Sequence, residues 1–352
     1  MLLLPFITLS VRRVEGIPTR HGWALGILAG IAIAFNPYLA PVWLFLLLWR
    51  RSWHSEDWAI VAVGVLYLAA VVVYAPGYLP LAFLLGPLSS QFGSAARLDL
   101  IADRLTAALL LLTVAYLLSR RPGFRSELEE GLIVAGFGFL VAVLLLGKGW
   151  SHHWYPVEAT VTLALLALPR PVFRAARIAT AAALVLVALS LARRLVTDAS
   201  DRAERRVEAW RGSTAMRLVP EAQTAAVLSV NLPDAWPWVL KREWTLRVPC
   251  LWFVQSAYPW GSPPRYRAPT AMSKGERFLY EVVVHDLSAR PPDLLLVESV
   301  AANAARSGPP GVDLLAYLGQ DPRFAQLMRR YRQVSNLDGM VLYRRAYSGR
   351  LH

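Results

Sequence analysis

The ten residues from Gly147 to Pro156 gather side chains that could bind a phosphate. The stretch reads Gly-Lys-Gly-Trp-Ser-His-His-Trp-Tyr-Pro and joins two apolar runs, 131–146 and 157–169. It contains Lys148, one of only three lysines in a chain that otherwise uses arginine for positive charge. Ammonium and imidazolium groups make charge-assisted hydrogen bonds to phosphate oxygens. Lys148 and His153 are therefore the first candidates for contact with an anionic ligand.

Aromatic rings in the same stretch indicate where these groups would lie. Trp150, Trp154 and Tyr155 have amphipathic rings of the kind found at the headgroup depth of a membrane. At that depth the cationic groups would meet the phosphate of a lipid. The pattern is equally consistent with an ordinary aromatic belt that carries a snorkelling lysine, so both interpretations stay open.

The order Lys-Gly-Trp-x-(Tyr or His)-His-x-x-Pro between two apolar runs resembles the late lipid-facing loop of the GT-C superfamily of membrane glycosyltransferases. Lys148, Trp150, His153 and Pro156 match that order, and His152 stands where a tyrosine is commoner. The resemblance is to enzymes similar to protein mannosyltransferases and aminoarabinose transferases, which take a sugar from a polyprenyl phosphate carrier. It implies a bacterial inner (plasma) membrane protein that binds a polyprenyl-phosphate sugar lipid.

The resemblance and the chemistry of the residues together give a set of candidates for the lipid phosphate, with Arg97 as an outsider, and leave the catalytic residues unknown. The phosphate-binding candidates are Lys148, His153, Trp150, Tyr155 and Arg97. The acidic residue of GT-C enzymes lies in their first external loop, and this chain is expected to begin after that point, as the C-terminal portion of such an enzyme. Residues 1–11 accordingly read as the end of a longer span, since the arginines follow the apolar residues.

The composition favours a membrane protein over a nucleic-acid-binding one. Hydrophobic residues make up 56% of the 352 residues, and the mean hydropathy is +0.40. The net charge is +13, but the arginines lie mostly at the ends of apolar runs and in the tail, where topology and contact with membrane lipids explain them. Cys250 is the only cysteine, so no disulfide within the chain and no cysteine cluster for a metal is expected, and no cofactor is indicated.

Residues 22–49 are expected to form a re-entrant hairpin. Gly22, Gly26 and Gly30 recur every four residues, which leaves one face of a helix bare for close approach by another helix. Asn36-Pro37 then breaks that helix, and each half is too short to cross a bilayer. The GT-C pattern has a lysine near this break, where this chain has Asn36.

The predicted fold is an α-helical polytopic membrane domain over 1–195, followed by an amphipathic connector over 196–213 and a small α/β domain over 214–352. The segment 78–98 reads as an external loop. The positive-inside rule places the arginine clusters in the cytoplasm, and hence 147–156 and everything after Arg194 outside. The predicted spans are 58–75, 105–118, 131–146, 157–169 and 176–192.

The tail alternates strand-like and helix-like segments, which predicts a mainly parallel sheet. We expect Asp293 and Asp321 to end or cap elements, and the His285-Asp286 dipeptide to be a surface pair. The expected strands are 225–230, 247–253, 293–297 and 340–345, and the expected helices are 234–241, 275–288 and 314–331 with a break near Asp321-Pro322. The tail also resembles the extracytoplasmic tail of some bacterial GT-C proteins in its Asp321-Pro322-Arg323-Phe324 run, Tyr331 and Tyr343-Arg344-Arg345.

Two other functions are compatible with the sequence. One is a non-catalytic membrane protein whose extracytoplasmic domain binds a partner or a glycan. The other is a transporter, for which the Asn36-Pro37 break would be a discontinuous helix, although the sequence has no detectable inverted repeat. Under the glycosyltransferase interpretation, Lys148 and His153 should line a cavity that opens to the outer leaflet and faces the tail.

Overall fold

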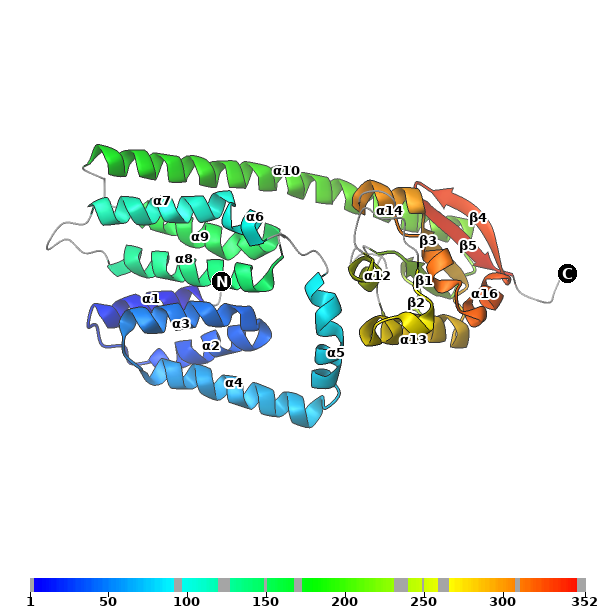
Figure 1. Cartoon of the computed structure of the whole chain (residues 1–352), viewed down its shortest axis with the longest axis horizontal. Helices are drawn as coiled ribbons and strands as arrows, with labels where there is room; N and C mark the ends of the chain where they lie inside the picture. The colour runs from blue at the N-terminus through cyan, green and yellow to red at the C-terminus, as the bar shows by residue number, and fades with distance from the viewer. Residues whose placement is uncertain are drawn as a thin grey trace. The chain divides into compact units, whose positions relative to one another are not determined.

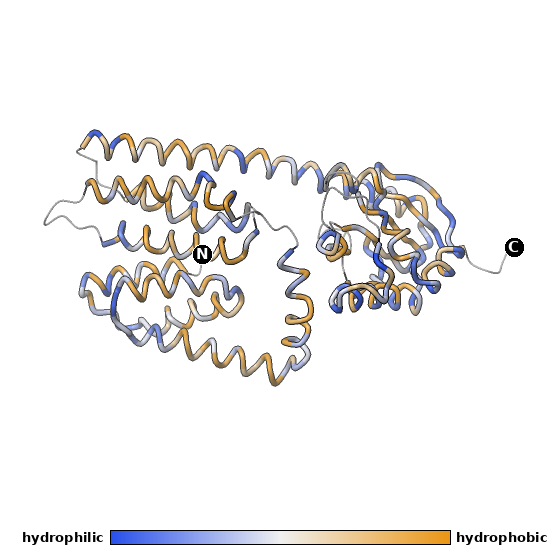
Figure 2. The backbone as a smooth tube through the Cα atoms, viewed as in Figure 1, coloured by the Kyte–Doolittle hydropathy of each residue, from blue (hydrophilic) through white to orange (hydrophobic). Residues whose placement is uncertain are grey.

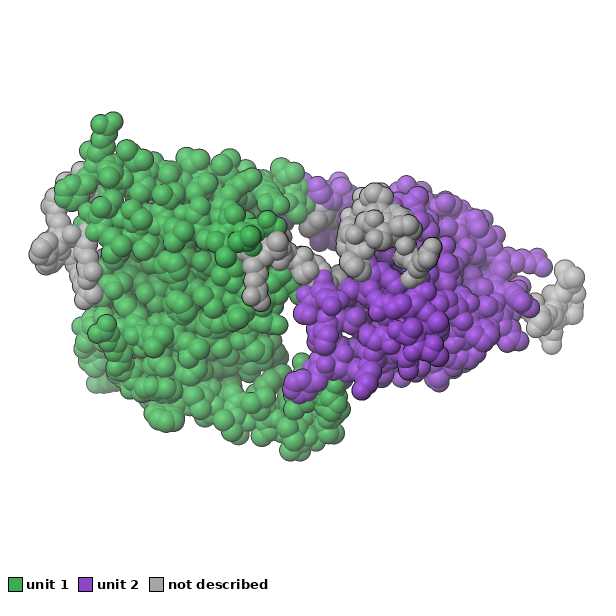
Figure 3. Space-filling view, in the orientation of Figure 1, with its two compact units in different colours: residues 1–80, 93–197 green, residues 81–92, 198–352 purple. Residues whose placement is uncertain are grey.

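The structure of the chain is a computed structural model that divides into two compact units (Figure 3). Unit 1 comprises Met1–Pro80 and Gly93–Thr197, and unit 2 comprises Leu81–Phe92 and Asp198–His352. The fold is mostly helical, with 72% helix and a small sheet. The structure describes residues 3–91, 97–119, 127–148, 151–167, 173–230, 240–248, 250–258, 266–307 and 311–346.

Unit 1 is a bundle of helices around an apolar core (Figures 1 and 2). Its core contains fully buried leucines and valines from different helices, among them Leu46, Leu109 and Val157. The helices that build it are α1 (Leu4–Val14), α2 (Gly22–Phe35), the short 3-10 helix η1 (Pro37–Leu39), α3 (Ala40–Arg50), α4 (Ser55–Tyr74), α6 (Arg97–Ile101), α7 (Arg104–Ser119), α8 (Glu127–Leu146), α9 (Ser151–Ala167) and the first part of α10 (Arg174–Leu218).

Within the described residues, three helices are long and apolar enough to cross a membrane by length and composition: α4, α8 and α10. Helices α4 and α8 have 20 residues each, which at 1.5 Å per residue is about the 30 Å of a bilayer's hydrocarbon core. The outer face of α4 is almost entirely apolar and exposed, because only 11% of its apolar window is buried. A lipid environment would cover such a face.

The glycine face predicted from the four-residue spacing is where α2 packs against α4. A Cβ on Gly26 would lie 2.3 Å from the backbone oxygen of Glu56, and one on Gly30 would lie 2.9 Å from Cβ of Val63. The two backbones can approach this closely only because both positions are glycine. The chain then turns back at Asn36 and η1, so that Gly22 at the start of α2 and Arg50 at the end of α3 both lie beside Glu56.

Two segments predicted from the sequence have different bounds in the structure. The expected connector over 196–213 is not a separate element, because α10 runs without interruption from Arg174 to Leu218. Its hydropathy falls along its second part, but no glycine or proline between 190 and 211 ends the helix (Figure 2). The expected loop over 78–98 contains helix α5 (Tyr78–Gln91), whose C-terminal part belongs to unit 2.

Unit 2 contains a five-stranded sheet, in the order β2-β1-β3-β5-β4 for the strands that the structure describes. The central strand β3 is buried along its whole length, as expected for a strand covered on both faces. The strands are β1 (Thr224–Leu228), β2 (Glu243–Trp244), β3 (Leu294–Glu298), β4 (Tyr331–Leu337) and β5 (Met340–Arg345). The helices are α12 (Trp252–Ala257), η2 (Pro269–Ala271), α13 (Lys274–Ala289), α14 (Val300–Ser307), α15 (Leu314–Leu318) and α16 (Pro322–Met328).

The prediction of a mainly parallel sheet was wrong. Strand β1 pairs in parallel with β2 and β3, whereas β5 pairs antiparallel with β3 and β4. Strands β4 and β5 form a hairpin through Asp338 and Gly339, whose φ angles are +48° and +88°. Asp-Gly with two positive φ angles is the preferred sequence of a tight two-residue hairpin turn. The dipeptide was therefore the signal for β4, which the sequence analysis treated as helix up to Tyr331.

Other parts of the tail prediction have clear outcomes. The strands expected near 225–230, 293–297 and 340–345 are confirmed as β1, β3 and β5, and the helix expected over 275–288 is confirmed as α13. The strand expected over 247–253 was wrong, because the chain there leads into helix α12. The short helix expected over 234–241 falls almost entirely on 231–239, outside the described residues.

The aspartates of the tail stabilise the ends of elements, as expected. Asp321 caps α16 by accepting a hydrogen bond from the Arg323 amide at 2.8 Å. Asp293 accepts from the amides of Gln223 and Thr224 and pairs with Arg345. His285 is largely exposed, but its neighbour Asp286 is buried and bound to the backbone and side chain of Arg247. Asp286 therefore joins α13 to the segment after β2.

Candidate functional site

The structure brings Lys148 and His153 together at the junction between α8 and α9. Helix α8 ends at Leu146, and Gly147 then takes a φ of +62°, which glycine adopts without strain. Helix α9 begins at Ser151, and the ring Nδ1 of His153 lies 3.5 Å from the carbonyl oxygen of Lys148. The neighbouring His152 ring packs edge-on against that of His153, with 4.2 Å between centroids. The junction thus concentrates one ammonium and two imidazoles.

Lys148 lies in a partly buried environment. Its side chain is half-buried, and burial lowers the pKa of its ammonium from the ordinary value. Burial has this effect because the charged form loses hydration.

Tyr155 belongs to a second cluster one turn into α9, with Arg194 of α10. The guanidinium carbon of Arg194 lies 3.9 Å from the centroid of the half-exposed Tyr155 ring, a cation–π geometry. The same guanidinium forms an ion pair with Glu158, which is only 3% exposed. Glu158 was missed by the sequence analysis. A carboxylate inside the apolar run 157–169 was the available signal, because such a residue needs a partner when it is removed from water.

Two other predicted site residues lie outside what the structure describes. Trp150 is one of the two residues between Lys148 and α9 that are not described. The backbone of Arg97 begins helix α6, but its side chain is outside the described set. Their contact with a lipid phosphate stays a prediction.

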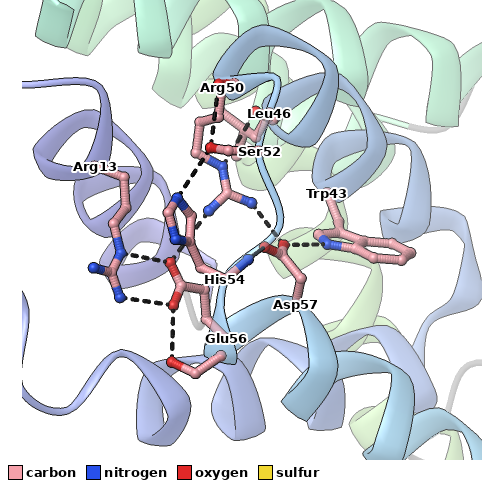
Figure 4. A network of polar contacts seen from close by, with 9 residues as sticks. Arg13, Trp43, Leu46, Arg50, Ser52, His54, Glu56 and Asp57 are labelled. Carbon is pink, nitrogen blue, oxygen red and sulfur yellow. Dashed lines mark hydrogen bonds and ion pairs between the residues drawn. The ribbon is translucent and has the colours of Figure 1, made fainter. Parts of the chain in front are cut away.

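A separate, fully satisfied polar network lies between the ends of α1, α3 and α4 (Figure 4). Glu56 accepts from Arg13 at 2.9 Å and 3.0 Å and from Arg50 at 3.2 Å. Asp57 accepts from Arg50 at 2.6 Å and from the Trp43 indole at 2.9 Å. Both carboxylates are 0% exposed. Both carboxylates are already bound by the guanidinium groups of Arg13 and Arg50. The network therefore stabilises the packing of α1, α3 and α4 and leaves no group for a ligand.

Unit 2 has a cavity of about 400 Å³ between α5 and the first turn of α13. Its polar lining includes Arg267, Lys274 and Glu276, and its apolar lining includes Phe83 and Leu84. The helices touch closely at Gly275, where a Cβ would lie 2.7 Å from the Leu84 carbonyl oxygen. No function was predicted for these residues from the sequence. Among the described residues, no group of three or more histidine, cysteine, aspartate or glutamate side chains could hold a metal ion.

Comparison of the chain with protein-family models, with curated proteins and with solved structures found no match.

Proposed function

We propose that unit 1 is a polytopic membrane domain whose α8–α9 junction binds the phosphate of a polyprenyl-linked sugar, as part of a GT-C-type glycosyltransferase. The observation that carries the proposal is the position of His153 beside Lys148 at that junction: the His153 Nδ1 lies 3.5 Å from the Lys148 carbonyl oxygen, and Lys148 is half-buried. The Lys148 ammonium would bind the phosphate oxygens and stabilise the negative charge that grows on the phosphate as the sugar leaves. Burial and the neighbouring His152 lower the pKa of His153 in the free protein, so its imidazole would add a second donor only when the arriving phosphate favours its protonated form. The residue that activates the acceptor is not assigned.

Contacts at the first turn of α8 support the orientation. At its first turn, Glu130 accepts from Trp49 of α3 at 3.1 Å and from Tyr116 of α7 at 2.9 Å. That end therefore lies with the C-terminal ends of α3 and α7, each followed in sequence by arginine. The junction lies at the other end of the 20-residue helix. With arginine-rich ends in the cytoplasm, Lys148 would face the extracytoplasmic side of a bacterial plasma membrane.

Binding of a polyprenyl phosphate to the purified full chain in nanodiscs tests the lipid part of the proposal. We expect Lys148→Ala to weaken binding by about tenfold or more, because one charge-assisted contact to phosphate is lost. The matched control is Lys241→Ala, at an exposed lysine of unit 2. The corresponding polyprenol, which has no phosphate, should bind the wild type and the Lys148 variant equally. Equal binding of the polyprenyl phosphate to both proteins would contradict the proposal.

Reporter fusions test the topology independently of the ligand. A reporter inserted after Lys148 and one fused after Ala346 should both respond as extracytoplasmic. Reporters on opposite sides of the membrane would rule out a lipid site and a tail domain that share one compartment.

A further inference from the structure

The lining of the cavity between α5 and α13 includes a buried carboxylate, and only one of its two oxygens accepts hydrogen bonds. Glu276 is 0% exposed, and its Oε1 accepts from the hydroxyls of Tyr258 at 2.9 Å and Tyr317 at 3.3 Å. Burial raises the pKa of Tyr258 to about 12, so this hydroxyl stays a donor at neutral pH. The other oxygen, Oε2, has no hydrogen-bond partner among the described residues. The nearest cation, Nη1 of Arg267, lies 3.6 Å away.

A buried carboxylate oxygen without a donor is costly, so its presence in the wall of a cavity points to a ligand. An unsatisfied buried acceptor loses about 1–3 kcal/mol of hydration, and more when it is charged. A hydroxyl or an ammonium group would satisfy it, and an ammonium would add to the charge compensation that the Arg267 ion pair provides at 3.6 Å. The Arg267 side chain is 43% exposed and is held through Nη2 by the Ala257 carbonyl oxygen, so an incoming group would have to displace its Nη1 from beside Oε2.

Positively charged groups line the cavity near the first turn of α13. The exposed ammonium of Lys274 and the exposed guanidinium of Arg267 line the cavity. The first-turn amides of Lys274 and Gly275 have no intrahelical acceptor, and the start of the 16-residue α13 carries positive partial charge. This edge favours a carboxylate or a phosphate. Because the lining has two cations, Arg267 and Lys274, and one carboxylate, Glu276, a ligand whose only charge is an ammonium would be repelled by the excess positive charge.

Helix α5 supplies the third wall, which is apolar. Phe83 is 81% exposed, and Leu84, Pro87 and Leu88 continue the lining beside it. A cavity of a few hundred Å³ with an apolar wall and a few converging polar groups is the usual form of a small-molecule site. An occupant must therefore combine a positive group, a negative group and an apolar part.

We propose that this cavity binds a small zwitterion, with an ammonium on Glu276 Oε2, an anionic group at Lys274 and the start of α13, and an apolar group against Phe83 and Leu84. This chemistry is common to a free apolar amino acid and to a phosphoethanolamine lipid headgroup. The site is separate from the α8–α9 junction and does not rest on the proposal of lipid phosphate binding there.

Three compounds that share an isobutyl group test which charged groups the ligand needs. We expect L-leucine to bind the full chain in phosphatidylcholine nanodiscs at least about tenfold more tightly than 4-methylpentanoate, which lacks the ammonium, or 3-methylbutylamine, which lacks the carboxylate. Isothermal titration calorimetry measures the three affinities. In a second arm, replacing phosphatidylcholine by phosphatidylethanolamine should protect the amides of 273–280 from hydrogen exchange, because only the primary ammonium can donate to Glu276.

The variants assign the binding to this cavity. Lys274→Gln should weaken the binding of the zwitterion by about tenfold, whereas Lys241→Gln, the matched exposed lysine, should not. Phe83→Ala should weaken it, and Phe278→Ala, an exposed phenylalanine of α13 outside the lining, should not. Glu276→Gln keeps an acceptor for the two tyrosines and should abolish the preference for leucine over 4-methylpentanoate.

The outcomes separate the two sources of the ligand and decide the proposal. Tight binding of leucine identifies a free amino acid, and protection by phosphatidylethanolamine without leucine binding identifies a headgroup. If neither probe acts on the wild type, if the single-charge analogues bind as well as leucine, or if Lys274→Gln leaves both responses unchanged, the proposal is overturned.

Discussion

The guanidinium of Arg50 donates to the carboxylate of Asp57 across 2.6 Å, and both side chains are buried. Arg50 is the last residue of α3 and Asp57 lies in the first turn of α4. Asp57 also accepts from the amide of His54 at 2.9 Å and from the Trp43 indole. One carboxylate therefore caps α4, neutralises the arginine that ends α3, and fixes the angle at which the two helices meet (Figure 4).

Replacing Asp57 should destabilise unit 1 strongly. In Asp57→Ala, Arg50 keeps only Glu56 as a charged partner, and α4 loses its cap. Removing one member of a buried ion pair costs about 3–5 kcal/mol, so the free energy of unfolding should fall by about that amount in a denaturant titration of the detergent-solubilised chain. Glu15→Ala, at an exposed acid after α1, is the control and should be near neutral. Similar stability of the two variants would contradict the structural role of the network.

A methyl group at Gly26 should force α2 and α4 apart. Its Cβ would lie 2.3 Å from the backbone oxygen and 2.6 Å from the Cα of Glu56, and backbone atoms cannot rotate away. Overpacking of this kind costs about 1–3 kcal/mol. Gly64→Ala is the matched control on α4, where a Cβ meets nothing within 4 Å, and it should be neutral or stabilising by up to about 1 kcal/mol because alanine favours helix. Thermal unfolding of both variants measures the difference, and an equal effect would refute this packing.

Glu158 and Arg194 should be energetically coupled across α9 and α10. A double-mutant cycle with Glu158→Gln and Arg194→Gln should give a coupling energy of about 0.5–3 kcal/mol, since each single change leaves a partly buried charge unpaired. The same cycle with the exposed neighbour Arg193 in place of Arg194 should be additive. Chemical denaturation of the six proteins gives both values. Coupling at residue 193 and none at 194 would show that the ion pair is not formed.

The stability of unit 2 should depend on Asp286 at acid pH. Burial raises the pKa of Asp286, but hydrogen bonds from Arg247 outweigh this effect and hold the pKa below its ordinary value. The carboxylate therefore stabilises the native state fully above the unfolded pKa of about 3.9, and this contribution is lost as the pH falls toward the lowered native pKa. Asp286→Asn should be less stable than wild type at pH 7, and the difference should shrink between about pH 5 and pH 3.

Unfolding midpoints followed by tryptophan fluorescence across that range check the prediction for Asp286. Glu281→Gln, at an exposed acid on the same helix, is the control and should follow the wild-type profile. A difference between Asp286→Asn and wild type that stays constant with pH would show that the charge of Asp286 is not involved.

Local patterns in the sequence predicted much of the fold. The spacing of Gly22, Gly26 and Gly30 predicted a close helix contact, and the apolar run after Pro291-Pro292 predicted the buried strand β3. The hairpin of β4 and β5 was equally local, because Asp338-Gly339 encodes its turn, but the signal was not used. For the candidate site, the sequence indicated Lys148 and His153, which are five positions apart in the chain, and the His153 ring lies beside the Lys148 carbonyl oxygen.

By itself, the sequence determined which segments are apolar helices, where glycine permits close packing, and which strands are buried. These properties depend on residues within a few positions of one another, so periodicity and turn residues reveal them. Only the tertiary structure decided that Glu56 meets Arg13 and Arg50, that Glu158 meets Arg194, and that α5 closes a cavity over Glu276. Those partners lie on different helices, and which helices pack together depends on the shape and burial of whole faces, which no single stretch of sequence specifies.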